Sequence, residues 1–147
     1  MGKYILDTNI IISLWKQDRA IKSFIEDNDI LILREVLEEL SKKERKRFNG
    51  AEIMSERFMK LVPFMYESNK FSFEEFLSDI NFENIKGKSY YYQGNKLTEI
   101  DLLLVFATKC NGEFQLVTED LGLFDFAKNI LGDNKVLRLG SVLSELL

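Results

Sequence analysis

Four acidic residues stand where their carboxylates could act together: Asp7, Glu39, Asp101 and Asp120. Asp7 ends the apolar run 3–6, and Asp120 closely follows the run 114–117. Both runs predict strands, and ligands of an open parallel sheet bind beyond the carboxyl ends of its strands. We therefore expect Asp7 and Asp120 at one edge of a sheet. Asp101 lies in the first turn of an apolar helix, where it can face the same edge.

The choice of Glu39 over Glu38 rests on helical rotation. The stretch 34–47 predicts a helix whose apolar residues are Val36, Leu37 and Leu40. At about 100° per residue, Glu38 lies roughly opposite that cluster, whereas Glu39 lies at its boundary, about 105° from its centre. A boundary carboxylate can reach a cleft while its helix packs on a sheet.

The absence of histidine narrows the chemistry of this acidic set. It excludes Ser-His-Asp and Cys-His catalysis and the usual zinc sites. Carboxylates gathered at one edge repel each other and resist desolvation, unless a divalent cation neutralises them. Oxygen ligands favour Mg²⁺ or Mn²⁺, and such an ion can activate water and polarise a phosphodiester.

Each acidic residue also has a structural interpretation. Asp7 and Asp120 are suited to cap the helices that follow them. Asp101, three residues after Thr98, stands at the acidic position of a capping box, and capping need not exclude metal binding. Glu39 is equally consistent with an ordinary surface residue.

Composition predicts one domain over residues 1–147, with a variable helical or loop region at about 50–97. The length and the 46% hydrophobic content suit a single core.

No apolar run approaches the ~20 residues of a membrane helix, and the carboxylate of Asp7 comes too early in the chain for a secretory signal. We therefore expect a cytoplasmic protein without a membrane partner. The net charge of −4 means that nucleic-acid binding would need a local basic patch.

The predicted elements alternate between strands and helices, which implies a parallel sheet with helices on its faces. Strands are expected at 3–6, 30–33, 114–117 and 135–138. Helices are expected at 9–15, 19–26, 34–47, 51–65, from 71 with Ser72 as N-cap, 98–110 and 123–131. The helix after Thr98 is apolar all round, so it should be central and buried. Residues 81–96 are expected to form a loop.

This pattern resembles the PIN-domain nuclease family. Four segments carry the resemblance, in the order of the family: Tyr4-Ile5-Leu6-Asp7-Thr8-Asn9, Val36-Leu37-Glu38-Glu39-Leu40, Thr98-Glu99-Ile100-Asp101 and Leu116-Val117-Thr118-Glu119-Asp120. The resemblance implies a three-layer α/β/α sandwich with a central parallel sheet. It also implies cleavage of single-stranded RNA with bound Mg²⁺ or Mn²⁺.

The resemblance places metal ligands at Asp7, Glu39, Asp101 and Asp120, with Thr118 beside the site and Asn9 orienting Asp7. Glu119 departs from the neutral or small polar residue that many members carry. The family includes VapC-type toxins of toxin–antitoxin pairs and RNA-processing nucleases. It thereby implies an antitoxin protein as one candidate partner, and homodimers are common in it.

Two further features concern RNA. Lys42, Lys43 and Lys46 follow Glu39 on the predicted helix and could guide a phosphate backbone, although they also suit a solvated helix end. The run Tyr90-Tyr91-Tyr92 could stack on unpaired bases or could pack against the protein. A catalytically silent PIN-like module that binds RNA or protein remains the alternative function. A phosphotransferase is disfavoured, because Asn9 occupies the second position of an Asp-x-Asp motif.

Overall fold

The computed structural model describes residues 2–48 and 51–146, with the backbone alone at 18–19, 45–48, 51–54 and 144–146. Its centre is a five-stranded parallel sheet with the strand order β10-β9-β1-β2-β5. The strands are β1 (Lys3–Leu6), β2 (Asp29–Leu33), β5 (Met65–Tyr66), β9 (Gln115–Val117) and β10 (Val136–Leu137). The chain moves outward from β1 through β2 to β5, then crosses to β9 on the other side of β1.

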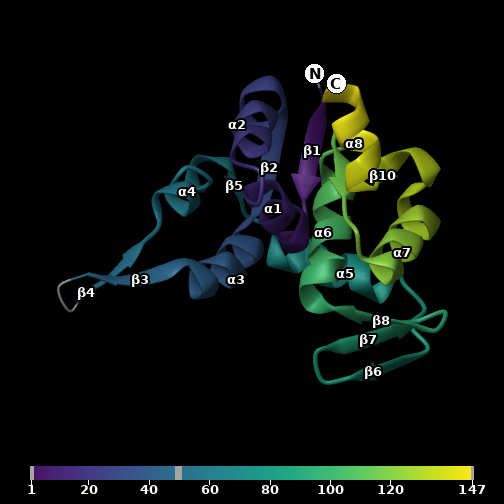
Figure 1. The fold of residues 1–147 in the computed structure, drawn as a ribbon. Helices are drawn as coiled ribbons and strands as arrows, with labels where there is room; N and C mark the ends of the chain where they lie inside the picture. Colours follow the sequence, from purple (N-terminus) through teal and green to yellow (C-terminus); the bar gives the residue numbers. More distant parts are fainter. Residues whose placement is uncertain (1, 49–50, 147) are drawn as a thin grey trace.

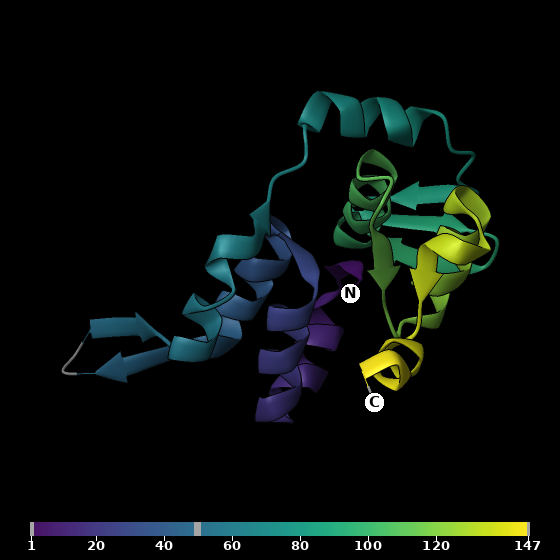
Figure 2. The same ribbon diagram turned by 90° about the horizontal axis from the view of Figure 1, so that it is seen from above.

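Helices cover both faces of this sheet, as Figures 1 and 2 show. α1, α2 and α3 pack together on one face, and α6 and α7 pack together on the other. The chain moves across the sheet in one direction from β1 to β5 and in the other direction from β5 to β10, and right-handed crossovers in opposite directions place their helices on opposite faces. The larger helices are α1 (Thr8–Trp15), α2 (Asp18–Asp27), α3 (Arg34–Glu44), α5 (Lys70–Ser78), α6 (Glu99–Cys110), α7 (Leu121–Leu131) and α8 (Leu139–Leu146). The predicted α/β/α sandwich with a central parallel sheet is confirmed.

The core forms where the apolar runs predict it. The consecutive residues Leu102 to Ala107 of α6 are all buried, which confirms the prediction of a central helix. In β1, Tyr4, Ile5 and Leu6 are buried as well. A helix buried all round and a strand covered on both faces have no need of the usual alternation with polar residues.

The predicted helix over 34–47 is too long. α3 ends at Glu44, and the chain continues as an antiparallel hairpin of β3 (Arg45–Phe48) and β4 (Ala51–Met54). The hairpin extends away from the sheet (Figure 1). Asn49-Gly50, the dipeptide most typical of hairpin turns, stands between the two strands in the sequence. That turn signal outweighs the helical propensity of the basic run.

The predicted helix over 51–65 is also wrong. Besides β4, the segment forms the short α4 (Glu56–Met59) and the 3-10 turn η1 (Val62–Phe64), and it runs into β5, which was not predicted. A two-residue strand is too short to show a period. α5 begins earlier than expected, because the side chain of Asn69 accepts a hydrogen bond of 3.0 Å from the amide of Ser72 and acts as N-cap in place of Ser72.

Residues 81–96 form a small sheet instead of the expected loop. Its antiparallel strands are β6 (Asn84–Lys86), β7 (Ser89–Tyr92) and β8 (Asn95–Thr98). Gly87 (φ 60°) opens one turn, and Gln93 (φ 47°) and Gly94 (φ 81°) form the other. Positive φ at these positions is what two-residue hairpin turns require. The 3-10 turn η2 (Asp133–Lys135) completes the elements, and no helix in the described part of the chain is long and apolar enough to cross a membrane.

Candidate active site

The carboxyl ends of β1 and β9 lie side by side. Leu6 at the end of β1 pairs with Val117 at the end of β9, so Asp7 and Thr118 follow at the same level of the sheet. The chain path leaves β1 towards β2 on one side and reaches β9 on the other. Such a switch point is where parallel α/β sheets bind ligands. Asp7 and Asp120 therefore share the sheet edge that the sequence predicts for them.

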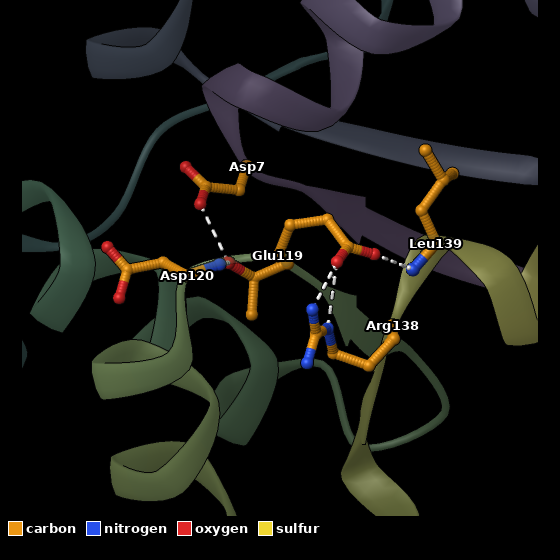
Figure 3. A network of polar contacts seen from close by, with 6 residues as sticks. Asp7, Glu119, Asp120, Arg138 and Leu139 are labelled. Atoms are coloured by element: carbon orange, nitrogen blue, oxygen red, sulfur yellow. Dashed lines mark hydrogen bonds and ion pairs between the residues drawn. The ribbon is translucent and has the colours of Figure 1, made fainter.

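Asp7 is held in place by two hydrogen bonds. Its Oδ1 accepts a bond of 2.7 Å from the amide of Thr8, and its Oδ2 accepts a bond of 2.8 Å from the hydroxyl of Thr118. Thr118 is fully buried, and Asp7 is only 7% exposed. Figure 3 shows the carboxylate of Asp7 turned towards the same side as that of Asp120. The position of Asp7 is thus fixed by groups on two neighbouring strand ends.

Asp101 and Asp120 both take part in capping the N-terminus of a helix. The amide of Thr98 donates to Oδ2 of Asp101 (2.9 Å), and the amide of Asp101 donates to the Thr98 hydroxyl (3.2 Å), which is the predicted capping box of α6. Oδ1 of Asp120 accepts from the amide of Leu123 (3.0 Å) and caps α7. Each cap uses one carboxylate oxygen and leaves the second for a ligand.

Burial and mutual repulsion disfavour the charged forms of these acids. The pKa of Asp101 is raised to about 6, chiefly by burial and to a smaller extent by the carboxylates of Asp7 and Asp120, while the hydrogen bonds with Thr98 oppose the rise. Burial also raises the pKa of Asp7, with smaller contributions from Asp120 and Glu39 against the hydrogen bonds from Thr118 and Thr8. A set of carboxylates with this electrostatic coupling would gain from a bound cation.

Glu39 lies nearer to this set than Glu38 does. The hydroxyl of Thr8 donates a hydrogen bond of 2.9 Å to Oε2 of Glu39, which ties α3 to the residue next to Asp7. The side chain of Glu38 is exposed and forms an ion pair of 3.5 Å with Arg34. Thr8 was missed in the sequence, although it stands between Asp7 and Asn9 in the matched segment.

The four acidic residues lie in the same region, but their carboxylates do not converge on a single metal position. Among the residues with described side chains, no three carboxylates lie close enough together to hold a metal ion. The oxygen-only donor set fits a hard divalent cation such as Mg²⁺ or Mn²⁺. Binding an ion with several of these acids at once would require their side chains to move closer together. The assignment of Asp7, Glu39, Asp101 and Asp120 as ligands stays a prediction.

Two residues beside the predicted ligands have contrasting environments. Thr118 contacts Asp7 directly, and its hydroxyl also accepts a hydrogen bond of 3.1 Å from the amide of Asp120. Asn9 is exposed, and the bonds that hold Asp7 come from Thr8 and Thr118. The influence of Asn9 on Asp7 stays a prediction.

Glu119 turns away from the acidic set. Its carboxylate accepts hydrogen bonds from the guanidinium of Arg138 and, at 2.7 Å, from the amide of Leu139 at the start of α8 (Figure 3). The Arg138 hydrogen bond lowers the pKa of Glu119, so its charge is stabilised away from the neighbouring Asp120. An additional acidic residue in this segment thus adds no ligand to the candidate site.

The lysines after Glu39 do not share one helix face. Lys42 lines a cleft of about 480 Å³ together with Glu39, Lys88, Ser89 and Thr98. Lys43 lines a different depression, beside Trp15. Lys46 belongs to β3 because α3 ends at Glu44, and its side chain lies outside the described residues. Of the three lysines, Lys42 is the one shown to border the cleft beside Glu39.

Taken together, the fold and the site define an α/β protein with acidic residues at the switch point of a parallel sheet. The family model for the PIN domain matches residues 4–137, so the chain belongs to the PIN-domain family, whose members are generally nucleases. No curated protein and no solved structure matches the chain significantly. The family match covers both strand ends and all four predicted ligand positions.

Proposed function

We propose that the protein is an endoribonuclease that cuts single-stranded RNA with Mg²⁺ or Mn²⁺. One observation supports the proposal: Asp7, Asp101 and Asp120 stand at the N-termini of α1, α6 and α7 and lie near enough for the charges of Asp7 and Asp120 to raise the pKa of Asp101. Helix N-termini also favour an approaching phosphate, because the positive ends of their dipoles attract anions. Acids for a cation and helix ends for a phosphodiester are the parts that a metal-dependent nuclease needs.

Asp7, Glu39, Asp101 and Asp120 are the residues that would hold the ion. A bound divalent ion lowers the pKa of water and stabilises charge on a phosphodiester. The chain itself supplies the positioning. Thr118 and the Thr8 amide orient Asp7, while the helix caps fix Asp101 and Asp120. Thr8 joins Glu39 to this frame.

The biological setting is proposed from family membership. We propose a cytoplasmic enzyme with one of two roles, either the toxin of a toxin–antitoxin pair, with an antitoxin protein as partner, or an RNA-processing nuclease; by analogy with the family we propose a homodimer. A small neighbouring gene that encodes a DNA-binding protein would support the toxin role. A gene neighbourhood of RNA-processing factors would instead support a processing nuclease.

Cleavage of a labelled single-stranded RNA tests the enzymatic proposal. Purified protein should cut the RNA in Mg²⁺ or Mn²⁺, and EDTA should stop the reaction. Asp7→Asn and Asp101→Asn should each reduce cleavage to background, because each removes one negative charge from the predicted ligand set. Cleavage by either variant at the wild-type rate would show that the proposed site is wrong.

A second candidate is a silent PIN-like module that binds RNA or protein. The observation that favours it is the spacing of the acids, since no three of the described carboxylates are close enough to hold an ion. Isothermal titration calorimetry with MnCl₂ separates the two candidates. Binding that is lost in Asp7→Asn supports the nuclease, whereas the absence of binding by the wild-type protein supports the silent module.

A further inference from the structure

The three consecutive tyrosines of β7 lie on two different faces of the small sheet. Tyr90 packs against Phe82 with ring centroids 5.1 Å apart, and Tyr92 packs against Phe126 with centroids 5.0 Å apart. Successive side chains of a strand point to opposite faces, so Tyr91 lies on the face turned away from these aromatic contacts. The sequence left packing and base stacking open for the whole run. The structure assigns packing to Tyr90 and Tyr92.

The face that carries Tyr91 is polar and basic. Strand register places six residues on it: Asn84, Lys86, Ser89, Tyr91, Lys96 and Thr98. None is acidic, although the whole chain has a net charge of −4. Lys86 and Lys96 are exposed, as is Lys88 in the adjoining turn, and none of the three pairs with a carboxylate in the described part of the chain. Their charges are therefore available to an anionic ligand.

This face continues into the candidate active site. Lys96 is the direct cross-strand partner of Tyr91. Thr98 is therefore the diagonal neighbour of Tyr91, and the Cα atoms of such a pair lie about 7–8 Å apart. Thr98 caps α6 and is hydrogen-bonded to Asp101. Ser89 and Thr98 also line the cleft that Glu39 borders together with Glu35, Glu38 and Glu99, and Lys42 and Lys88 bring positive charge to the same cleft. A ligand on the sheet face would reach the acidic set without crossing an intervening element.

We propose that the face of the small sheet that carries Tyr91, Lys86 and Lys96 is a platform for single-stranded RNA. The Tyr91 ring stacks on an unpaired base, and Lys86 and Lys96 contact the phosphates on either side. Stacking on an aromatic ring tolerates every base, and the lysines attract the backbone irrespective of sequence. The inference rests on the proposed ribonuclease function. Beyond that function, it specifies where the RNA binds before it reaches the predicted metal ligands.

Binding measured in EDTA tests the platform separately from cleavage. The probe is a fluorescein-labelled oligouridylate of twelve nucleotides, and the readout is fluorescence anisotropy. Tyr91→Thr removes the ring and keeps a residue that favours strands. It should weaken binding at least ~5-fold, the lower end of the ~1–3 kcal/mol measured for one base stack. Tyr91→Phe keeps the ring and should bind within about twofold of the wild type.

Two controls make the result specific. Phe71→Ala removes a ring that is 70% exposed on α5, outside the platform, and should not change binding. The double variant Lys86→Ala/Lys96→Ala should reduce the slope of log K against log salt by ~1.4, because each phosphate contact on a single strand contributes ~0.7. Circular dichroism melting of Tyr91→Thr should show a folded protein at the assay temperature. If it does not, the lysine double variant alone decides the question.

The outcomes separate the platform from the nuclease. Equal binding by the wild type and Tyr91→Thr, or an unchanged salt slope in the lysine variant, would overturn the platform, even if the wild type cuts RNA in Mg²⁺. Binding that depends on Tyr91 in a protein that does not cut RNA would support the platform and contradict the nuclease. Failure of the wild type to bind the oligonucleotide would overturn the platform.

Discussion

The hydroxyl of Thr118, at the end of β9, donates a hydrogen bond of 2.8 Å to Oδ2 of Asp7, at the end of β1. This bond joins two strand ends that lie 111 positions apart in the sequence. The same hydroxyl accepts a bond from the amide of Asp120. One buried side chain thus couples the positions of two predicted metal ligands.

Replacing Thr118 by valine should destabilise the protein by about 1–3 kcal/mol, since it leaves a buried carboxylate oxygen without its donor. Thr108→Val is the matched control. Thr108 is also buried, and its hydroxyl donates to the carbonyl of Leu104 within α6, where the helix already satisfies the backbone. Urea unfolding in EDTA measures both variants. An equal loss in the two would contradict the proposed role of the Thr118–Asp7 bond.

Stability of the metal-free protein should fall as pH rises through the titration of Asp101. The folded state holds the Asp101 proton up to a pKa of about 6, whereas the ordinary value is 3.8. The folded state therefore binds more protons than the unfolded chain in this range, and the free energy of unfolding decreases with rising pH. Its favourable contribution is complete below 3.8 and is lost by about pH 6.

Asp101→Asn isolates this effect, because asparagine keeps an oxygen for the Thr98 amide and does not titrate. The difference in melting temperature between variant and wild type, measured in EDTA from pH 3.5 to 7 (about half a unit per step), should favour the variant increasingly as pH rises. A difference that stays constant across this range would contradict the pKa shift of Asp101. Adding Mg²⁺ at the upper end should restore stability to the wild type by offsetting the charge.

Much of the central fold is predictable, because the sequence patterns that specify it are either long apolar runs or motifs of a few neighbouring residues. The apolar run of α6 needs no knowledge of its neighbours to be identified as a buried helix. Asp7 and Asp120 each follow a predicted strand, and parallel strands end at one edge. The capping box of Thr98 and Asp101 is a local pattern as well. These features predict the placement of three of the four acids.

The remainder depends on contacts that a linear reading does not show. Met65–Tyr66 becomes a strand because it pairs with Ile32 and Leu33 of β2, and two residues display no period. The small sheet over 84–98 depends on the glycines of two tight turns, which resemble loop signals in isolation. Thr8 reaches Glu39 only after α1 and α3 have packed together. The outward position of the half-buried Tyr91 ring likewise follows from strand register and not from composition.

Glu119 and Asp120 are neighbours with different roles, which gives a matched pair of variants. Asp120→Asn should abolish RNA cleavage, because it changes a predicted ligand. Glu119→Gln should leave the cleavage rate within about twofold of the wild type, since Glu119 faces Arg138 and the start of α8. It should lower stability by about 0.2–1 kcal/mol, as expected for a partly exposed ion pair. A large loss of cleavage in Glu119→Gln would place its carboxylate in the site after all.

The assignment of Glu39 can be tested against its neighbour on the same helix. Glu39→Gln should weaken Mn²⁺ binding at least about tenfold, since perturbing even the residues behind metal ligands costs that much. Glu38→Gln should leave Mn²⁺ affinity unchanged, because Glu38 is exposed and pairs with Arg34. Titration calorimetry provides the affinities, and both substitutions remove the same charge from α3, so a general field effect would move them together. Equal weakening in the two variants would therefore exclude Glu39 as a specific ligand and leave Asp7, Asp101 and Asp120 as the remaining candidates.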